Sequence, residues 1–319
     1  YSDLEIIGNL KTGVPLVNKL ISNSLWSQKD NFLDVPTDCP QRDERLGWTG
    51  DAQIFSKTAM FNMNCYAFYR KYLKDLYLHQ VDSDGIPPVW CPQIGGCMKT
   101  EGMIGWSDAA TIIPWNVYVM CGKKQILYDQ YEGMKKWVDI MTENINEEGL
   151  WEVDDQQFCD WLALDGPKNI LNKNGTIGGT ENTFVCTVFY YISLLIVSKA
   201  AKVLCKNEDY EKYHNLAIQT LKTIREEYFS PRGRCTIQTQ TALSLAIIHD
   251  LQPEGKMNVS LGSLVKLLQN RDFHLCTGFI GTQILCRALS KAGDTRDAVT
   301  TFLKKDYPGW LYPVTMGAT

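Results

Sequence analysis

Apolar residues that recur at helical spacing limit the fold of this chain more than any other feature. Such spacing predicts about ten helices near residues 16–30, 51–80, 108–121, 124–145, 181–205, 208–229, 238–251, 258–270, 279–292 and 294–305. Asp51 and Asp108 stand where helix N-caps are expected. Strand signals are confined to short pieces such as 149–153. The sequence therefore predicts an all-α protein.

Long loops separate some of these helices, at residues 31–50, 82–107 and 146–180. They hold many of the Pro and Gly residues and are rich in aromatic residues, which argues against disorder. Loops of this length in a compact protein are usually functional. Repeated helix pairs with long loops on one side fit a toroid of antiparallel helices whose loops form a single mouth. The longest apolar run, 184–197, is too short to span a bilayer and predicts a buried core helix.

Charge and cysteine content exclude several functions. The net charge of −4 argues against nucleic acid or an anionic membrane as partner, since both select clustered Lys and Arg. The 11 cysteines are odd in number, spread singly and form no CxxC pair. They predict free, mostly buried thiols in a reducing compartment, hence a cytoplasmic protein. Only 4 histidines occur, without zinc-binding spacing, so no metal site is expected.

The segment 34–53, which we call the acid loop, concentrates charged residues before a predicted helix. Its five carboxylates are Asp34, Asp38, Asp43, Glu44 and Asp51. One interpretation is a salt-bridged helix start, because acidic residues favour helix N-termini. The other is acetal hydrolysis, in which one carboxyl group protonates the leaving oxygen and another carboxylate activates water. Crowding and burial raise the pKa of some carboxyl groups in such a cluster.

A family resemblance favours the second interpretation. The stretch DCPQRDERLGWTGDAQ (38–53) resembles the signature of the bacterial-type α-L-rhamnosidase family, and SLWSQKDNFLDVPT (24–37) is similar to the segment before it. Further similar stretches are GWSDAATIIPW (105–115), DWLALD (160–165), TQTALSLAI (239–247), HLCTGFIGTQIL (274–285) and DYPGWLYPVTMGAT (306–319). The resemblance implies an (α/α)6 barrel, the six-hairpin toroid, which agrees with the predicted helices.

The resemblance also implies the roles of individual residues. Glu44 is expected to be the general acid of an inverting glycoside hydrolase that removes terminal α-L-rhamnose from glycosides or polysaccharides. Lining of the rhamnose pocket is expected from Asp38, Arg42, Trp48 and Asp51, with Asp38 and Asp51 holding hydroxyls. Trp106 and Trp161 are expected to form the wall around the methyl group of this 6-deoxy sugar, and His274 to add a polar contact. No metal or organic cofactor is implied.

Four of these residues have a plainer alternative. Trp106 precedes a predicted helix and is alternatively a core anchor. Trp161 alternatively packs inside its own loop, and His274 is alternatively a structural histidine. Arg42 alternatively only orients the neighbouring acids.

The end of the sequence sets a further expectation. In the family, the general base lies on a Thr-Ile-Trp-Glu segment directly after Gly-Ala-Thr, and this sequence ends at Thr319 of Gly-Ala-Thr. Ten predicted helices also fall short of twelve. We therefore expect one barrel domain over 1–319 without its last helix pair or flanking β-domains, and poor activity of this piece alone. The alternatives are a non-catalytic carbohydrate-binding remnant and another (α/α)6 glycosidase acting on glucosides.

Overall fold

The computed structural model describes residues 1–93, 102–151, 157–166, 171–172, 175–176 and 178–319. The chain forms two compact units. The first unit contains Tyr1–Asn144, Ile192–Ala217 and Thr319, and the second contains Ile145–Tyr191 and Ile218–Ala318. The prediction of one domain over 1–319 stays a prediction.

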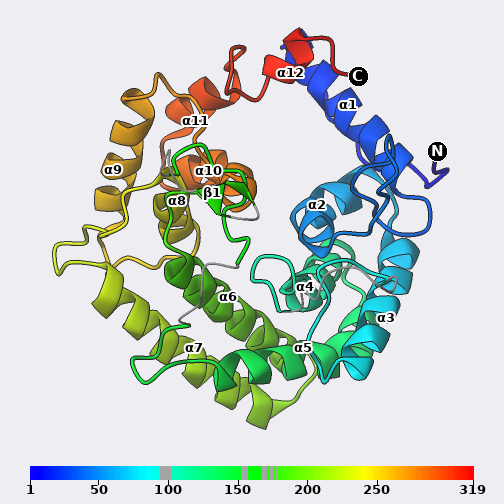
Figure 1. The fold of residues 1–319 in the computed structure, drawn as a ribbon, viewed down its shortest axis with the longest axis vertical. Helices are drawn as coiled ribbons and strands as arrows, with labels where there is room; N and C mark the ends of the chain where they lie inside the picture. Colours follow the sequence, from blue (N-terminus) through cyan, green and yellow to red (C-terminus); the bar gives the residue numbers. More distant parts are fainter. Residues whose placement is uncertain (94–101, 152–156, 167–170, 173–174, 177) are drawn as a thin grey trace. The chain divides into compact units, whose positions relative to one another are not determined.

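The first unit is built from helices packed side by side. Its complete helices are α1 (Pro15–Asn31), α2 (Thr49–Asn62), α3 (Tyr66–Asp82), α4 (Ala109–Cys121) and α5 (Gln125–Glu143). It also takes the end of α6 (Asn182–Val203) and the first half of α7 (Asn207–Tyr228). Helix α4 packs against α2, α3 and α5 (Figure 1). Fully buried Tyr69, Tyr72 and Leu73 of α3 lie in this core.

The second unit contains the remaining elements. Its helices are α8 (Gln240–Ile248), α9 (Met257–Gln269), α10 (Phe279–Lys291), α11 (Thr295–Phe302) and α12 (Tyr312–Thr315), with parts of α6 and α7. Helix α8 packs against α9 and α10, and α10 packs against α11 (Figure 1). Two short strands, β1 (Leu171–Asn172) and β2 (Gly175–Thr176), pair antiparallel.

One predicted helix is wrong. The helix expected over 51–80 is two helices, α2 and α3, because the chain becomes extended at Met63 (φ −139°, ψ 156°). There Met63 bridges Ile6, and the Asn62 carbonyl accepts the N–H groups of Ile7 and Gly8 at 3.0 and 3.1 Å. The apolar spacing continues through the break, so periodicity alone did not reveal it.

Smaller differences concern caps, strands and the helix count. Helix α2 is capped by Trp48, so Asp51 lies in its first turn instead of at the cap. Asp108 is the N-cap residue of α4 but makes no side-chain cap hydrogen bond. The strand signal at 149–153 gives no strand at 149–151, and 152–153 lie outside the described residues. The described residues form twelve helices, counting the single turn of α12, so ten was too low and the count no longer argues for an absent pair.

Buried thiols and the apolar helix agree with the sequence prediction. Ten cysteines are described and all are free, six of them buried, while Cys97 lies outside the described residues. Helix α6 is long and apolar enough to cross a membrane by length and composition, but most of its apolar window is buried inside the structure. Phe184, Leu194 and Val197 are fully buried, so the predicted core helix is confirmed.

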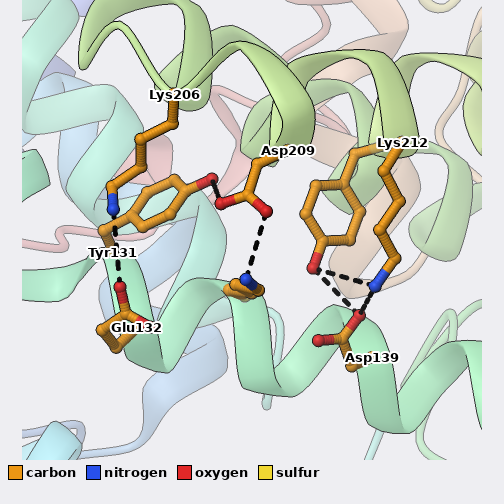
Figure 2. A network of polar contacts seen from close by, with 8 residues as sticks. Tyr131, Glu132, Asp139, Lys206, Asp209 and Lys212 are labelled. Carbon is orange, nitrogen blue, oxygen red and sulfur yellow. Dashed lines mark hydrogen bonds and ion pairs between the residues drawn. The ribbon is translucent and has the colours of Figure 1, made fainter.

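Polar side chains join α5 to the first half of α7 on the outside of the first unit (Figure 2). Asp209 accepts hydrogen bonds from Tyr131 at 2.8 Å and from Lys135 at 3.1 Å. Asp139 accepts one from Lys212 at 2.7 Å. Most of these charged groups are partly exposed, so the contacts orient the two helices more than they stabilise them.

Candidate active site

The middle of the acid loop, residues 38–46, is a closed turn. It is closed by the Asp38 N–H, which donates to the Leu46 carbonyl at 3.0 Å. Between them the Glu44 N–H donates to the Arg42 carbonyl at 2.8 Å, and Arg45 takes a left-handed conformation with φ 53°. Asp38 and Glu44 therefore lie on the same short turn.

The loop's exit is tied to residues 88–91 by backbone contacts. The Gly47 carbonyl accepts the Cys91 N–H at 2.8 Å and the hydroxyl of buried Tyr72 at 3.0 Å. The Thr49 N–H donates to the Val89 carbonyl at 2.9 Å. These contacts fix where α2 begins and so fix Asp51 relative to the turn.

The structure sorts the five carboxylates of the acid loop into two groups. Asp34 pairs with Lys71 at 2.9 Å, and Asp43 lies 3.9 Å from Arg45 on the surface. Those two fit the salt-bridge interpretation. The other three, Asp38, Glu44 and Asp51, influence one another electrostatically. Arg42 is exposed, and the sequence prediction for it stays a prediction.

Asp51 is the carboxyl group whose pKa is raised by burial and by nearby charges. Its pKa is raised from 3.8 to about 7, first by burial and then by the charges of Asp38 and Glu44, against a lowering backbone hydrogen bond. A group with this pKa exchanges its proton near neutral pH. The first turn of α2 therefore carries a carboxyl group that is partly protonated near neutral pH.

Trp48 places an indole N–H on Glu44. Its Nε1 donates a short hydrogen bond to Glu44 Oε1, and the Leu46 N–H lies 3.4 Å from the other carboxylate oxygen. The Trp48 ring meets the ring of Trp90 edge-on, with centroids 5.1 Å apart. Trp90 is buried, and its ring packs against the ring of Trp48. Sequence reasoning missed Trp90, because one Trp in a long loop carries no signal of its partner.

Trp106 lies against the start of α2. A Cβ on Gly50 would come within 2.7 Å of the Trp106 ring, so the absence of a side chain at Gly50 allows the close approach. Trp106 is only 4% exposed, as the core-anchor alternative expects. Its role in the sugar wall stays a prediction.

The second unit contains the other two residues that were predicted to contact the sugar, Trp161 and His274. Trp161 is partly exposed and meets Phe158 of the same loop edge-on, with centroids 5.5 Å apart. His274 Nδ1 lies 2.9 Å from the Arg271 carbonyl, so this nitrogen carries the proton. Its Nε2 lies 3.0 Å from Asp306 Oδ2. The Nδ1 contact fits the structural alternative for His274, the Nε2 contact is an ion pair only with a protonated ring, and the sugar contact stays a prediction.

A cation is conceivable at the acid loop on geometry alone. One ligand atom each from Asp38, Cys39 and Glu44 lies within 4.8 Å of the others. Partly exposed acidic groups often gather without a metal, and Cys39 is bound up locally: burial, followed by its hydrogen bond with Asp38, raises the pKa of this thiol. A raised pKa disfavours the thiolate form that binds metals, so the cluster fits acid–base chemistry better than a metal site.

Comparison with known proteins gives one consistent family. The model of the bacterial alpha-L-rhamnosidase six-hairpin glycosidase domain matches residues 5–319. An alpha-L-rhamnosidase of Alteromonas sp. is 37% identical over all of this chain and 34% of its own length. One from Formosa agariphila is 35% identical over all of this chain and 33% of its own length. The chain thus spans about a third of the length of these curated relatives.

Solved structures agree on the fold. The alpha-L-rhamnosidase of Streptomyces avermitilis, solved in complex with L-rhamnose, has a TM-score of 0.89 at 32% identity over 99% of this chain and 29% of its own. The Aspergillus terreus enzyme has a TM-score of 0.90 at 34% identity over 99% of this chain and 36% of its own.

The fold class is therefore that of the six-hairpin glycosidases, and the predicted (α/α)6 class is confirmed. Within that class, the chain belongs to the bacterial alpha-L-rhamnosidase six-hairpin glycosidase domain family.

Proposed function

We propose that the protein carrying this chain hydrolyses terminal α-L-rhamnose from glycosides or polysaccharides, with Glu44 as the proton donor. The observation that carries the proposal is the convergence of Asp38, Glu44 and Asp51 at the start of α2, beneath Trp48. Membership of the rhamnosidase family and the rhamnose-bound Streptomyces avermitilis structure support rhamnose as the sugar.

The proposed chemistry gives the three carboxyl groups different roles. Glu44 gives a proton to the departing glycosidic oxygen, which removes the need to expel an alkoxide. Asp51 holds a proton near neutral pH and can donate a hydrogen bond to a sugar hydroxyl as well as accept one. Asp38 accepts from a hydroxyl, and the indole of Trp48 keeps Glu44 oriented. We assign only the acid side of the inverting reaction to this chain.

The test is the leaving-group dependence of Glu44→Gln in the complete protein. Hydrolysis of a rhamnoside with a poor leaving group, such as an alkyl alcohol, should fall about 10²- to 10⁴-fold, because protonation by a general acid is lost. Hydrolysis of a dinitrophenyl rhamnoside, whose leaving group departs without a proton, should change much less. An equal loss with both substrates would remove Glu44 from the role of acid.

Asp43→Asn is the matched control, since it removes a neighbouring carboxylate that is exposed and that, among the described residues, forms an ion pair only with Arg45, at 3.9 Å. Both rhamnosides should be hydrolysed as by the unchanged protein. A loss that equals the effect at Glu44 would indicate a general effect of charge on the acid loop.

Two other functions are separated by substrate. An (α/α)6 glycosidase of different specificity would hydrolyse an aryl glucoside faster than an aryl α-L-rhamnoside. A carbohydrate-binding remnant would show a rhamnose-dependent change in tryptophan fluorescence without release of reducing sugar, also in the complete protein. The family match favours the rhamnosidase over both.

A further inference from the structure

Asp160, in the second unit, is a buried carboxylate saturated with hydrogen-bond donors. It is 2% exposed. Its Oδ1 accepts the N–H groups of Ile280 and Gly281, each at 3.0 Å. Its Oδ2 accepts the Gly278 N–H at 3.0 Å and a short hydrogen bond from the Thr241 hydroxyl. Three of the four donors are backbone groups at the start of α10, where the helix dipole favours an anion.

The same carboxylate joins three segments that are distant in the sequence. It belongs to the loop 160–166, Thr241 belongs to α8, and the three N–H groups belong to the segment 278–281. The backbone closes the junction further: the Phe279 N–H donates to the Trp161 carbonyl at 2.8 Å, and the Leu164 N–H donates to the Cys276 carbonyl at 2.9 Å.

Close packing makes this junction rigid around Trp161. A Cβ at Gly278 would come within 2.3 Å of the Trp161 carbonyl oxygen and 2.5 Å of the Asp160 carbonyl oxygen. The backbone of Trp161 therefore packs directly against the start of α10, with no space for a side chain at Gly278. Trp161 as a whole is partly exposed.

Only an ionised carboxylate meets all four donors. Each oxygen of Asp160 accepts two hydrogen bonds, whereas an amide at the same place would set an NH₂ group against two donors. Burial raises the pKa of Asp160 above its ordinary value, and the hydrogen bonds from Thr241, Gly281 and Gly278 offset only part of that rise. Asp160→Asn is thus nearly unchanged in volume and wrong only in its hydrogen-bonding pattern.

We propose that Asp160 is a positioning residue for Trp161 and that it thereby sets the preference for a 6-deoxy sugar over the same sugar with a C6 hydroxyl. This inference rests on the proposed function and on the predicted contact of Trp161 with the sugar's methyl group. An apolar wall rejects an added hydroxyl by on the order of 10²-fold. A wall whose backbone is no longer held by the carboxylate loses part of that discrimination.

The experiment compares two aryl glycosides that differ by one hydroxyl, the α-L-rhamnoside and the α-L-mannoside. The ratio of their kcat/KM values is measured for the complete protein and its variants. Asp160→Asn should lower the rhamnoside preference about tenfold, and Trp161→Ala should lower it at least as much, towards loss of the roughly 10²-fold selection. Lower stability alone reduces the active fraction equally for both substrates and leaves the ratio unchanged.

Two further variants keep the test decisive. Thr241→Val removes one of the four donors at equal volume and should lower the ratio two- to fivefold, which serves if Asp160→Asn does not fold. Asp165→Asn is the matched control on the same loop, because Asp165 accepts one N–H from Gly179 at 2.8 Å, and its ratio should equal that of the unchanged protein.

The outcomes separate this inference from the proposed function. Absence of rhamnoside hydrolysis by the unchanged protein overturns the proposed function and the inference together. Normal hydrolysis, with an unchanged ratio in Trp161→Ala or in folded Asp160→Asn and Thr241→Val, overturns the inference alone. A ratio that falls in Trp161→Ala, Asp160→Asn and Thr241→Val but not in Asp165→Asn supports it.

Discussion

Two groups of acidic residues in this protein are built in opposite ways. In the first unit, burial and then the charges of Asp38 and Glu44 raise the pKa of Asp51 to about 7. In the second unit, Asp160 meets four donors, three of them backbone N–H groups. The first arrangement makes proton exchange easy near neutral pH, while the second fixes a carboxyl group by four donors and so holds backbone segments together.

The difference separates a carboxylate that does chemistry from one that maintains structure. A crowded cluster costs stability, since each charge opposes the others, and such strain is typical of functional sites. A carboxylate saturated with donors adds stability because its removal leaves several buried groups without partners. The following predictions test this contrast, from the largest effect to the smallest.

Asp160→Asn should cost the most stability. The change leaves backbone donors opposed by an NH₂ group, so the free energy of unfolding should fall by about 2 to 4 kcal/mol. Chemical denaturation measures it, with Glu44→Gln as control, which should stay within about 0.5 kcal/mol of the unchanged protein. A larger loss for Glu44→Gln than for Asp160→Asn would reverse the assignment of the two regions.

Asp51→Asn should change how stability depends on pH. The folded-state pKa of Asp51, about 7, lies above its ordinary value of 3.8, so the folded state binds the proton more tightly. This group therefore lowers stability as pH rises from about 4 to 7, by about 2 kcal/mol when solvent screening is allowed for. Asparagine does not titrate.

The variant should consequently gain stability relative to the unchanged protein between pH 4.5 and 8. Denaturation at both pH values measures the difference, and subtraction cancels the other titrating groups. A difference that is flat across this range would contradict the assignment of the raised pKa to Asp51.

Gly50→Ala should disturb Trp106 and not the helix. The added methyl group would lie within 2.7 Å of the Trp106 ring, so the expected loss of stability is about 1 to 2 kcal/mol, with altered tryptophan fluorescence. Gly262→Ala in α9 is the control, because nothing lies within 4 Å of its Cβ. There alanine should stabilise by about 0.5 to 1 kcal/mol, as in any open helix position. Equal effects at both glycines would mean that Trp106 is free to move.

Lys212→Met should lower the free energy of unfolding least among these variants. It removes the charge that meets Asp139 in the contacts between α5 and α7 (Figure 2). Partly exposed ion pairs contribute little, so the expected loss is below about 1 kcal/mol and should shrink further in 1 M salt. A loss above that of Asp160→Asn would show that surface pairs, not buried carboxylates, hold the helices.

Sequence alone determined the helical class and the acid loop. Apolar spacing predicts helices because a buried stripe must recur every three to four residues, and α5 and α7 follow it closely. The concentration of acids in 34–53 allowed either a salt-bridged helix start or acetal hydrolysis, and the resemblance of 38–53 to the rhamnosidase signature favoured the second.

Tertiary structure decided which of those acids form ion pairs, which has a raised pKa, and which distant residues contact them. It paired Asp34 with Lys71, left Asp51 with the raised pKa, and placed Trp90 behind Trp48. It also joined Asp160 to residues about 80 to 121 positions away. Burial and long-range hydrogen bonds depend on which segments pack together in the folded protein. The spacing of residues along the chain does not specify those contacts.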